Sequence, residues 1–355
     1  MSRKKKFSAA IGQLMIPLVA LGILIVFNLF RDISFFSIGM RVNNAGNVVL
    51  TGNLISVIDS ASELAIISMG MTLVTAATGG QDISVGAVGA IAGAVFVKVL
   101  QGMGAITGTS VFVGLLACIF VTILFKLFNG TLVAVFRIQP MIATLILYSC
   151  GRSIAYWING DATPQLNSPI ISSIGKTIPG VPIPTPIFAV ALVGLLLFLI
   201  FRFTSLRLYT QSVGINEGAA RLNGINPTYI KLLTFAILGV CVAVAGVIGV
   251  ARLGQLNHKT LLADIEMDAI LAVAIGGNNL GGGNYKISGS ILGAYIIQML
   301  TTTLYAMNVA PVNVKAYKAI VIIIIVVAGS PVVKNALSKL FQRAKTGMSA
   351  KKGVA

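Results

Sequence analysis

The segment SVGINEGAARLNGIN, from Ser212 to Asn226, is followed directly by the apolar run PTYIKLLTFAILGVCVAVAGVIGVARL, from Pro227 to Leu253. The apolar run exceeds the roughly 20 residues that an α-helix needs to cross a bilayer. The polar segment before it therefore joins two membrane helices. The rest of the chain repeats this alternation of long apolar runs and short polar connections, so the two stretches together indicate the fold class.

The polar segment carries the residues of a short capped helix. Asn216 is placed to accept hydrogen bonds from the free N–H groups of the first turn, and Glu217 lies at the positive end of the helix dipole. Arg221 follows Glu217 by one turn. Gly224 tolerates the positive φ of a helix stop, and Asn226 can cap the next helix. The pattern predicts helix, tight turn and helix, and leaves open whether this is a plain loop or a docking element for a soluble partner.

The composition indicates an integral membrane protein. The chain has 355 residues, of which 56% are hydrophobic and 10% charged, and its mean hydropathy is +0.95. A soluble domain of this length has no use for so much apolar surface. The net charge of +17 could point to nucleic acid, but the basic residues cluster in loops and tails, and no basic stripe with interleaved aromatics is present.

The residues that enzymes and metal sites need are scarce. Cys118, Cys150 and Cys241 all lie in apolar runs without metal-ligand spacing and are interpreted as small packing residues. The single histidine, His258, excludes a multi-histidine metal site and is expected in a solvated loop. No nucleophile elbow lies near it. We therefore predict no catalytic, metal or cofactor site in this chain.

Apolar runs predict an all-α, polytopic bundle of about ten transmembrane helices. The basic MSRKKK precedes the first run, which is too long for a cleaved signal peptide and is taken as an uncleaved span. The weakest prediction is the short run 266–276. The ten runs are Ile11–Phe30, Ser56–Ala77, Ser84–Leu100, Val111–Phe136, Pro140–Ile158, Pro186–Phe203, Pro227–Leu253, Glu266–Gly276, Ser288–Met307 and Val314–Val333.

Charge distribution orients these spans. An even number of spans with both termini in the cytoplasm places most of the 26 Lys and Arg residues inside. The predicted organisation is a basic cytoplasmic N-terminus (1–10), a single transmembrane domain (11–333) with a cytoplasmic connection at 204–230, and a basic cytoplasmic tail (334–355). Most acidic residues then fall on the outer side: Asp32, Asp59, Glu63, Asp161, Asp264, Glu266 and Asp268.

Two pairs of glycines have the G-x-x-x-G spacing that allows helices to approach closely. Gly89 and Gly93 form one pair, and Gly289 and Gly293 form the other. We expect them to pack within one subunit, while a dimer face remains an alternative for one pair.

Two basic residues fall inside predicted spans. Lys126 lies in the cytoplasmic half of its helix and is expected to extend toward the interface. Arg152 lies nearer the outer side, where a guanidinium needs a partner, either in a transport pathway or in a structural ion pair.

Two connections are rich in glycine or proline. The outer loop Asn159–Thr185 is expected to be passive, although it could gate an external mouth. The inner loop GGNNLGGG, from Gly276 to Gly283, predicts tight turns and close backbone approach. It lacks the Lys-Ser/Thr ending of a phosphate loop, so nucleotide binding by this chain is not expected.

Four stretches together resemble the membrane permease subunits of bacterial ABC importers for simple sugars, in the ribose, xylose and galactose branch. The resemblance runs from about Asn53 to Val333. The stretches are GMTLVTAATGGQDISVGAV at Gly70–Val88, NGTLVAVFRIQPMIATLIL at Asn129–Leu147, GINEGAARLNGI at Gly214–Ile225 and MDAILAVAIGGNNLGGG at Met267–Gly283. Gln81 departs from the apolar residue usual in this family. Arg152 and Asn167–Pro169 look closest to a galactofuranose-type branch.

The resemblance implies a multi-pass protein of the bacterial inner membrane, surrounded by membrane lipid, that forms the pathway for a monosaccharide. Its implied partners are cytoplasmic ABC ATPase subunits, a second permease subunit, identical or sister, and an extracytoplasmic sugar-binding protein. Asp82, Ser84, Gln139, Thr144 and Arg152 are candidates for the substrate pathway. The residues implied to contact the ATPase are Gly214, Asn216, Glu217, Ala219, Ala220, Arg221 and Gly224.

Alternatives from other classes are weaker. An ion-gradient-driven secondary transporter normally carries acidic or histidine residues at mid-membrane, and the predicted spans have almost none there. An intramembrane enzyme lacks a paired nucleophile and base. At the outer face, the acidic cluster with Arg31, Arg41 and Arg252 is a candidate landing surface for the binding protein, and lipid headgroup anchoring is the alternative for the two early arginines.

Overall fold

A computed structural model describes the backbone of residues 3–42, 48–160 and 162–329, and within these ranges the side chains of Met15 and residues 17–323. The predicted tail 334–355 and Asp161 lie outside the described residues. The elements are α1 (Arg3–Arg31), the 3-10 helix η1 (Ile33–Phe36), β1 (Gly39–Val42), β2 (Val48–Thr51), α2 (Asn53–Ser60), α3 (Ser62–Thr78), α4 (Val85–Gly102), α5 (Gly108–Ala134), α6 (Pro140–Asn159), α7 (Pro169–Gly175), α8 (Thr185–Phe203), α9 (Leu206–Ile215), α10 (Glu217–Leu222), α11 (Pro227–Leu253), α12 (Ile265–Ile275), α13 (Ile287–Ala306) and α14 (Pro311–Gly329).

Each of the ten predicted apolar runs overlaps a helix in the described residues, and the run Ser56–Ala77 is divided between α2 and α3. The end of the tenth run, 330–333, lies outside the described residues. By length and composition, 7 of the described helical segments are long and apolar enough to cross a membrane. One of them is α2 and α3 taken together. The remaining three predicted spans correspond to α1, α12 and α14, and α12 has only 11 residues. Because α1 begins at Arg3, the basic N-terminal residues and the first predicted span form one helix.

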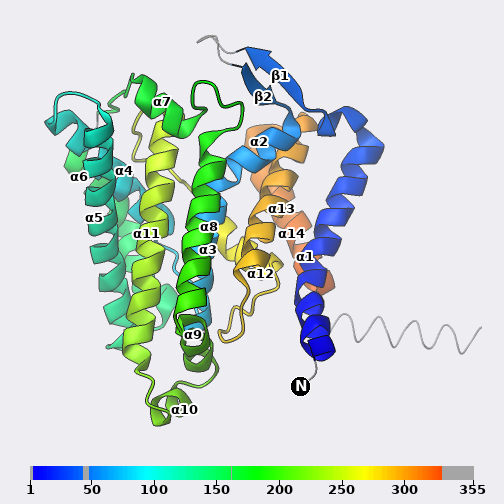
Figure 1. The fold of residues 1–355 in the computed structure, drawn as a ribbon, viewed down its shortest axis with the longest axis vertical. Helices are drawn as coiled ribbons and strands as arrows, with labels where there is room; N and C mark the ends of the chain where they lie inside the picture. The colour runs from blue at the N-terminus through cyan, green and yellow to red at the C-terminus, as the bar shows by residue number, and fades with distance from the viewer. Residues whose placement is uncertain (1–2, 43–47, 161, 330–355) are drawn as a thin grey trace, which may run out of the picture. The chain divides into compact units, whose positions relative to one another are not determined.

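The chain divides into two compact units, residues 1–302 and 303–355. In the first unit, α11 packs against α3, α4 and α5, and α4 packs against α5 and α6 (Figure 1). The described part also contains one β-hairpin, in which β1 and β2 pair antiparallel with Gly39 opposite Thr51. The predicted all-α class did not include this hairpin.

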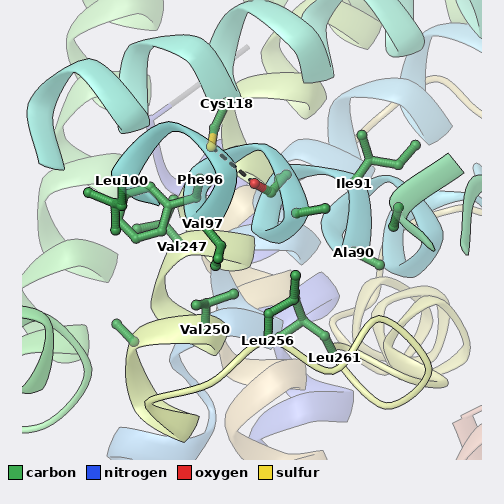
Figure 2. Packing of buried hydrophobic residues seen from close by; sticks show 14 of the residues in the cluster. Ala90, Ile91, Phe96, Val97, Leu100, Cys118, Val247, Val250, Leu256 and Leu261 are labelled. Atoms are coloured by element: carbon green, nitrogen blue, oxygen red, sulfur yellow. Dashed lines mark hydrogen bonds between the residues drawn. The ribbon is translucent and has the colours of Figure 1, made fainter. Parts of the chain in front are cut away.

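The core lies where α4, α5 and α11 meet. Figure 2 shows Phe96 and Val97 of α4 beside Val247 and Val250 of α11, all of them buried. Cys118 of α5 donates a hydrogen bond through its thiol to the carbonyl oxygen of Ala92, at 3.1 Å. The prediction that this cysteine serves packing is confirmed.

Both glycine pairs pack against other parts of the same chain. Added Cβ atoms at Gly89 and Gly93 would meet the side chains of Leu262 and Leu261. Added Cβ atoms at Gly289 and Gly293 would overlap the backbone carbonyl groups of Gly276 and Ala272. The expectation of packing within one subunit is therefore confirmed for both pairs.

One face of α5 is apolar and exposed along its length. Its exposed side chains recur every four residues and are Phe112, Leu116, Phe120, Leu124 and Phe128. Residues at this spacing lie on the same face of a helix. A contiguous apolar stripe of this kind is suited to contact with lipid chains rather than water.

Candidate functional site

The predicted helix, turn and helix is present at 206–253, and α10 forms its tip (Figure 1). The Ala219 N–H donates to the side-chain oxygen of Asn216, at 2.9 Å, which caps α10. Gly224 has φ +78°, the left-handed conformation expected of the stop. Asn226 caps α11 by accepting from the Tyr229 N–H, at 3.3 Å. All three capping predictions are confirmed.

Glu217 connects α10 to α11 as well as to its own helix. Its carboxylate lies 3.6 Å from the guanidinium of Arg221, the predicted one-turn pair, and 2.6 Å from the ammonium of Lys231. The hydrogen bond from Lys231, together with the charges of Lys231 and Arg221, holds the pKa of Glu217 below its ordinary value against the opposing effect of burial. The closer partner, Lys231, was not predicted, because it lies 14 residues further along the sequence and in a different helix. The ion pair fixes the orientation of α10 relative to α11.

The surface of α10 has two distinct sides. Ala220 is buried against α9 and α11, whereas Ala219 and Arg221 are exposed. Leu222 is 91% exposed and Ile215, just before α10, is 66% exposed, although both are large and apolar. Sequence reasoning missed these two residues. An exposed apolar pair at the tip of a well-capped helix is a suitable contact for another protein.

Gly214 faces the interior of its own chain. A Cβ at this position would overlap the carbonyl oxygen of Ala76, near the end of α3. The Gly283 N–H donates to the same carbonyl oxygen at 2.9 Å, and the Gln81 side chain donates to the carbonyl oxygen of Leu280 at 3.0 Å. The glycine-rich loop 276–283 therefore makes the close backbone approach that was predicted, and it does so between the end of α3 and the end of α9.

A polar cluster is completely buried where α3 gives way to α4. The Lys126 ammonium donates to the Asp82 carboxylate and to the Ser84 hydroxyl, each at 2.8 Å. The Ser84 hydroxyl donates to Asp82 at 2.6 Å and also accepts from the Asn129 amide at 2.9 Å. All four side chains have no exposed surface. The cluster joins the connection 79–84 to α5.

The prediction that Lys126 extends toward the interface is wrong. Its ammonium is fully buried because Asp82, 44 residues earlier in the sequence, supplies a carboxylate inside the protein. Thr144 joins the same region by accepting a hydrogen bond from the Ile83 N–H, at 3.1 Å. Three of the candidate pathway residues, Asp82, Ser84 and Thr144, are thus brought together, but as parts of a closed cluster.

The other two pathway candidates lie apart from this cluster. Gln139 is exposed at the start of α6. Arg152, on the same helix, donates hydrogen bonds through Nη1 to the carbonyl oxygens of His258, Lys259 and Leu261, at 2.7–3.2 Å. Its observed partners are therefore backbone carbonyls of the loop before α12.

One expectation for the opposite end of the bundle is corrected. His258 is buried, and its ring contacts that of Tyr156 edge to face at 5.5 Å, so it is not a solvated loop residue. Arg252 pairs with Asp59 at 2.6 Å and with Glu63 at 2.8 Å. Its charge is therefore compensated within the chain, and the landing surface predicted to include it stays a prediction. The loop 159–185, which was predicted to lie outside, contains the short helix α7.

Comparison with known proteins places the chain in a family. Residues 53–328 match the family described as branched-chain amino acid transport system / permease component, and the chain belongs to it. The chain is 38% identical to the galactofuranose transporter permease protein of Escherichia coli, over 79% of this chain and 80% of the relative. It is 34% identical to the fructose import permease protein of Bifidobacterium longum, over 95% and 93%. It is 32% identical to the ribose import permease protein of Escherichia coli, over 79% and 86%.

No solved structure matches the chain. The relatives confirm the resemblance to sugar-importer permeases of the ribose and galactose branch that the four sequence stretches indicated. With the apolar helices of the bundle, they identify a multi-pass protein of the bacterial inner membrane.

Proposed function

We propose that this chain is the membrane permease subunit of an ATP-binding-cassette importer, and that it forms the pathway for a monosaccharide. In this proposal an extracytoplasmic binding protein delivers the sugar, a second permease subunit completes the pathway, and separate cytoplasmic ATPase subunits hydrolyse ATP. Ten helices, including α1, α12 and α14, make up the membrane domain, with both termini in the cytoplasm. Kinship with sugar import permeases supports the transport role.

The observation that carries the coupling role is the exposed tip of α10. Leu222 and Arg221 are exposed there, while Glu217 and the buried Ala220 anchor the helix to the rest of the chain. A rigid helix with an apolar end fits a groove on a soluble ATPase. ATP-driven closure of the ATPase dimer would then displace α10, provided that loop and groove bind differently in the two states.

Among the residues proposed to couple transport to ATP hydrolysis, the roles differ. Asn216 and Gly224 set the ends of the helix, and Gly214 and Ala220 hold it against the permease. Ala219, Arg221 and Leu222 face outward and would make the contact.

Leu222→Glu tests the contact directly. Because Leu222 is 91% exposed, the substitution leaves the fold of the permease intact, and we expect it to abolish co-purification with the cognate ATPase and sugar uptake. The matched control is Met103→Glu, an exposed methionine in the connection between α4 and α5. Retention of both ATPase binding and uptake in Leu222→Glu would show that α10 is not the docking element.

Charge reversal gives an independent test. Glu217→Lys alone places three cations together with Arg221 and Lys231, so we expect insertion in the membrane but no coupled transport. Combining it with Arg221→Glu restores one opposite-charge pair on α10. If ATPase co-purification and uptake both survive in the double variant, docking through the charges of this helix is wrong.

Proteoliposomes separate the importer from a secondary transporter. Purified chain alone should not take up sugar in response to a proton or sodium gradient, and uptake should require ATPase, ATP and binding protein. Ion-driven uptake without the ATPase would refute the proposal. Binding of pentoses, pyranoses and furanoses to the cognate binding protein would identify the sugar.

A further inference from the structure

A cavity of about 460 Å³ lies between the end of α8, the start of α9 and the start of α13. This volume falls within the range of small-molecule sites, which is about 300–1,000 Å³. One end of the cavity is cationic and the rest is mainly apolar. The residues that carry the argument are Leu197, Phe198, Phe201, Arg207, Tyr285 and Lys286.

The two cations lie at the ends of membrane-spanning helices. Arg207 follows the end of α8 by four residues, and Lys286 immediately precedes α13. Both helices are long and apolar enough to cross a bilayer. Cations directly beyond the ends of such spans lie at the depth of lipid headgroups.

The cationic end is held in place by the glycine-rich loop. The Lys286 N–H donates to the Asn278 side-chain oxygen at 2.6 Å, and the Asn278 amide donates to the Lys286 carbonyl oxygen at 3.2 Å. Partial burial and the positive charge of Arg207 lower the pKa of Lys286. Arg207 forms no ion pair with any carboxylate in the described part of the chain. Arg207 and Lys286 therefore present two neighbouring positive charges to the cavity, which favours an anionic group there.

The apolar wall continues from this end into the membrane region. Along α8 it runs from Gly194 to Phe201, which is roughly 10 Å at 1.5 Å per residue. This is about two thirds of one leaflet of a hydrocarbon core about 30 Å thick. The rings of Phe201 and Tyr285 meet edge to face at 6.2 Å and close one side of the cavity. Phe198 is 62% exposed, so the cavity is accessible from the lipid-facing side of α8.

We propose that this cavity binds a phospholipid with an anionic headgroup, whose phosphate lies between Arg207 and Lys286 and whose acyl chain follows Phe198 and Leu197 along α8. A soluble anion would use only the cationic end and would leave the apolar wall without a function. The site is adjacent to α9, which leads into α10, so bound lipid would also stabilise that connection.

Native mass spectrometry of the purified chain tests the proposal. Phosphatidylglycerol and phosphatidylcholine with identical acyl chains are added to the protein in detergent, with glycerol phosphate as the soluble anion. We expect phosphatidylglycerol to bind most tightly. Each of Arg207→Gln and Lys286→Gln should weaken it about fivefold and the double variant roughly thirtyfold, as two independent contacts between basic residues and an anionic lipid surface would.

The matched control is Arg202→Gln combined with Lys98→Gln, which removes the same charge from exposed positions outside the cavity. This control should keep the affinity of the wild-type chain. Equal binding of the two lipids, equal losses in the two double variants, or equally strong binding of glycerol phosphate would each overturn the proposal. If the double variant does not fold, the preference of the wild-type chain and its decrease with added salt decide the question.

Discussion

The buried Lys126–Asp82 pair gives the sharpest prediction for stability. Lys126→Met removes a cation from a site with no exposed surface. Among the described residues, the Asp82 carboxylate then keeps only the Ser84 hydroxyl and N–H as donors. Breaking a buried ion pair in this way costs about 3–5 kcal/mol, because the remaining charge cannot reach water. At about 2–4 °C per kcal/mol, the unfolding midpoint should fall by roughly 6–20 °C.

The double variant separates charge burial from lost packing. Asp82→Asn alone strands the Lys126 ammonium and should cost as much as Lys126→Met. The two substitutions together remove both charges, and replacement of a buried pair by neutral groups is often close to neutral. We therefore expect the double variant to be more stable than either single variant, with a coupling energy of several kcal/mol.

The assay is thermal unfolding of the four purified proteins in one detergent, followed by tryptophan fluorescence or by light scattering. Lys98→Met is the control, since this lysine is exposed on α4. A loss of less than about 1 kcal/mol in Lys126→Met, or a double variant that is the least stable of the set, would refute the buried-pair interpretation.

Three further predictions concern Gly214, Arg152 and Glu217. Gly214→Ala should destabilise the chain by about 1–3 kcal/mol in thermal unfolding, because its Cβ overlaps the end of α3, whereas Gly218→Ala, which has room, should not. Arg152→Gln removes three hydrogen bonds to the loop before α12 and should speed amide hydrogen exchange at residues 258–261. Unchanged exchange there would contradict the role of Arg152 in holding this loop. Because the folded-state pKa of Glu217 is lowered, its stabilising effect is present above the usual glutamate pKa of about 4.3 and is lost as pH falls through the lower value. The protection factors of the α10 amides, which correct for the slower intrinsic exchange in acid, should therefore fall on acidification in the wild type but not in Glu217→Gln.

Local patterns sufficed for the helices and the caps. In the part of the chain that the structure describes, apolar runs located every helix long and apolar enough to span the membrane, since backbone groups in lipid must be satisfied within one segment. The Asn216 and Asn226 caps and the Gly224 stop were also predicted, because each depends on residues within one turn. Gly214 was predicted as part of the ATPase-coupling segment, which stays a prediction, and its packing against α3 depends on a contact between distant parts of the sequence.

The polar cluster required tertiary information. Lys126 and Asp82 are far apart in the sequence, and no local rule pairs them. A signal was nevertheless present in α5. The polar residues Thr122 and Lys126 recur at four-residue spacing, two positions out of phase with the exposed stripe that includes Phe120 and Leu124. Two residues correspond to about 200° around a helix, so the lysine had to face the protein interior.

The backbone contact of Gly214 and Gly283 with the end of α3 determines how a displacement of α10 could be transmitted through this protein. Side chains at a contact can change rotamer, and such changes absorb small displacements. Here the surfaces in contact are backbone, and the hydrogen bond from Gly283 to the Ala76 carbonyl fixes their spacing at 2.9 Å. A displacement of α10 would therefore be transmitted to α3 with little change in the distance between the two backbones. Lengthening this junction by even one methyl group would alter the mechanical linkage while leaving every proposed partner contact unchanged.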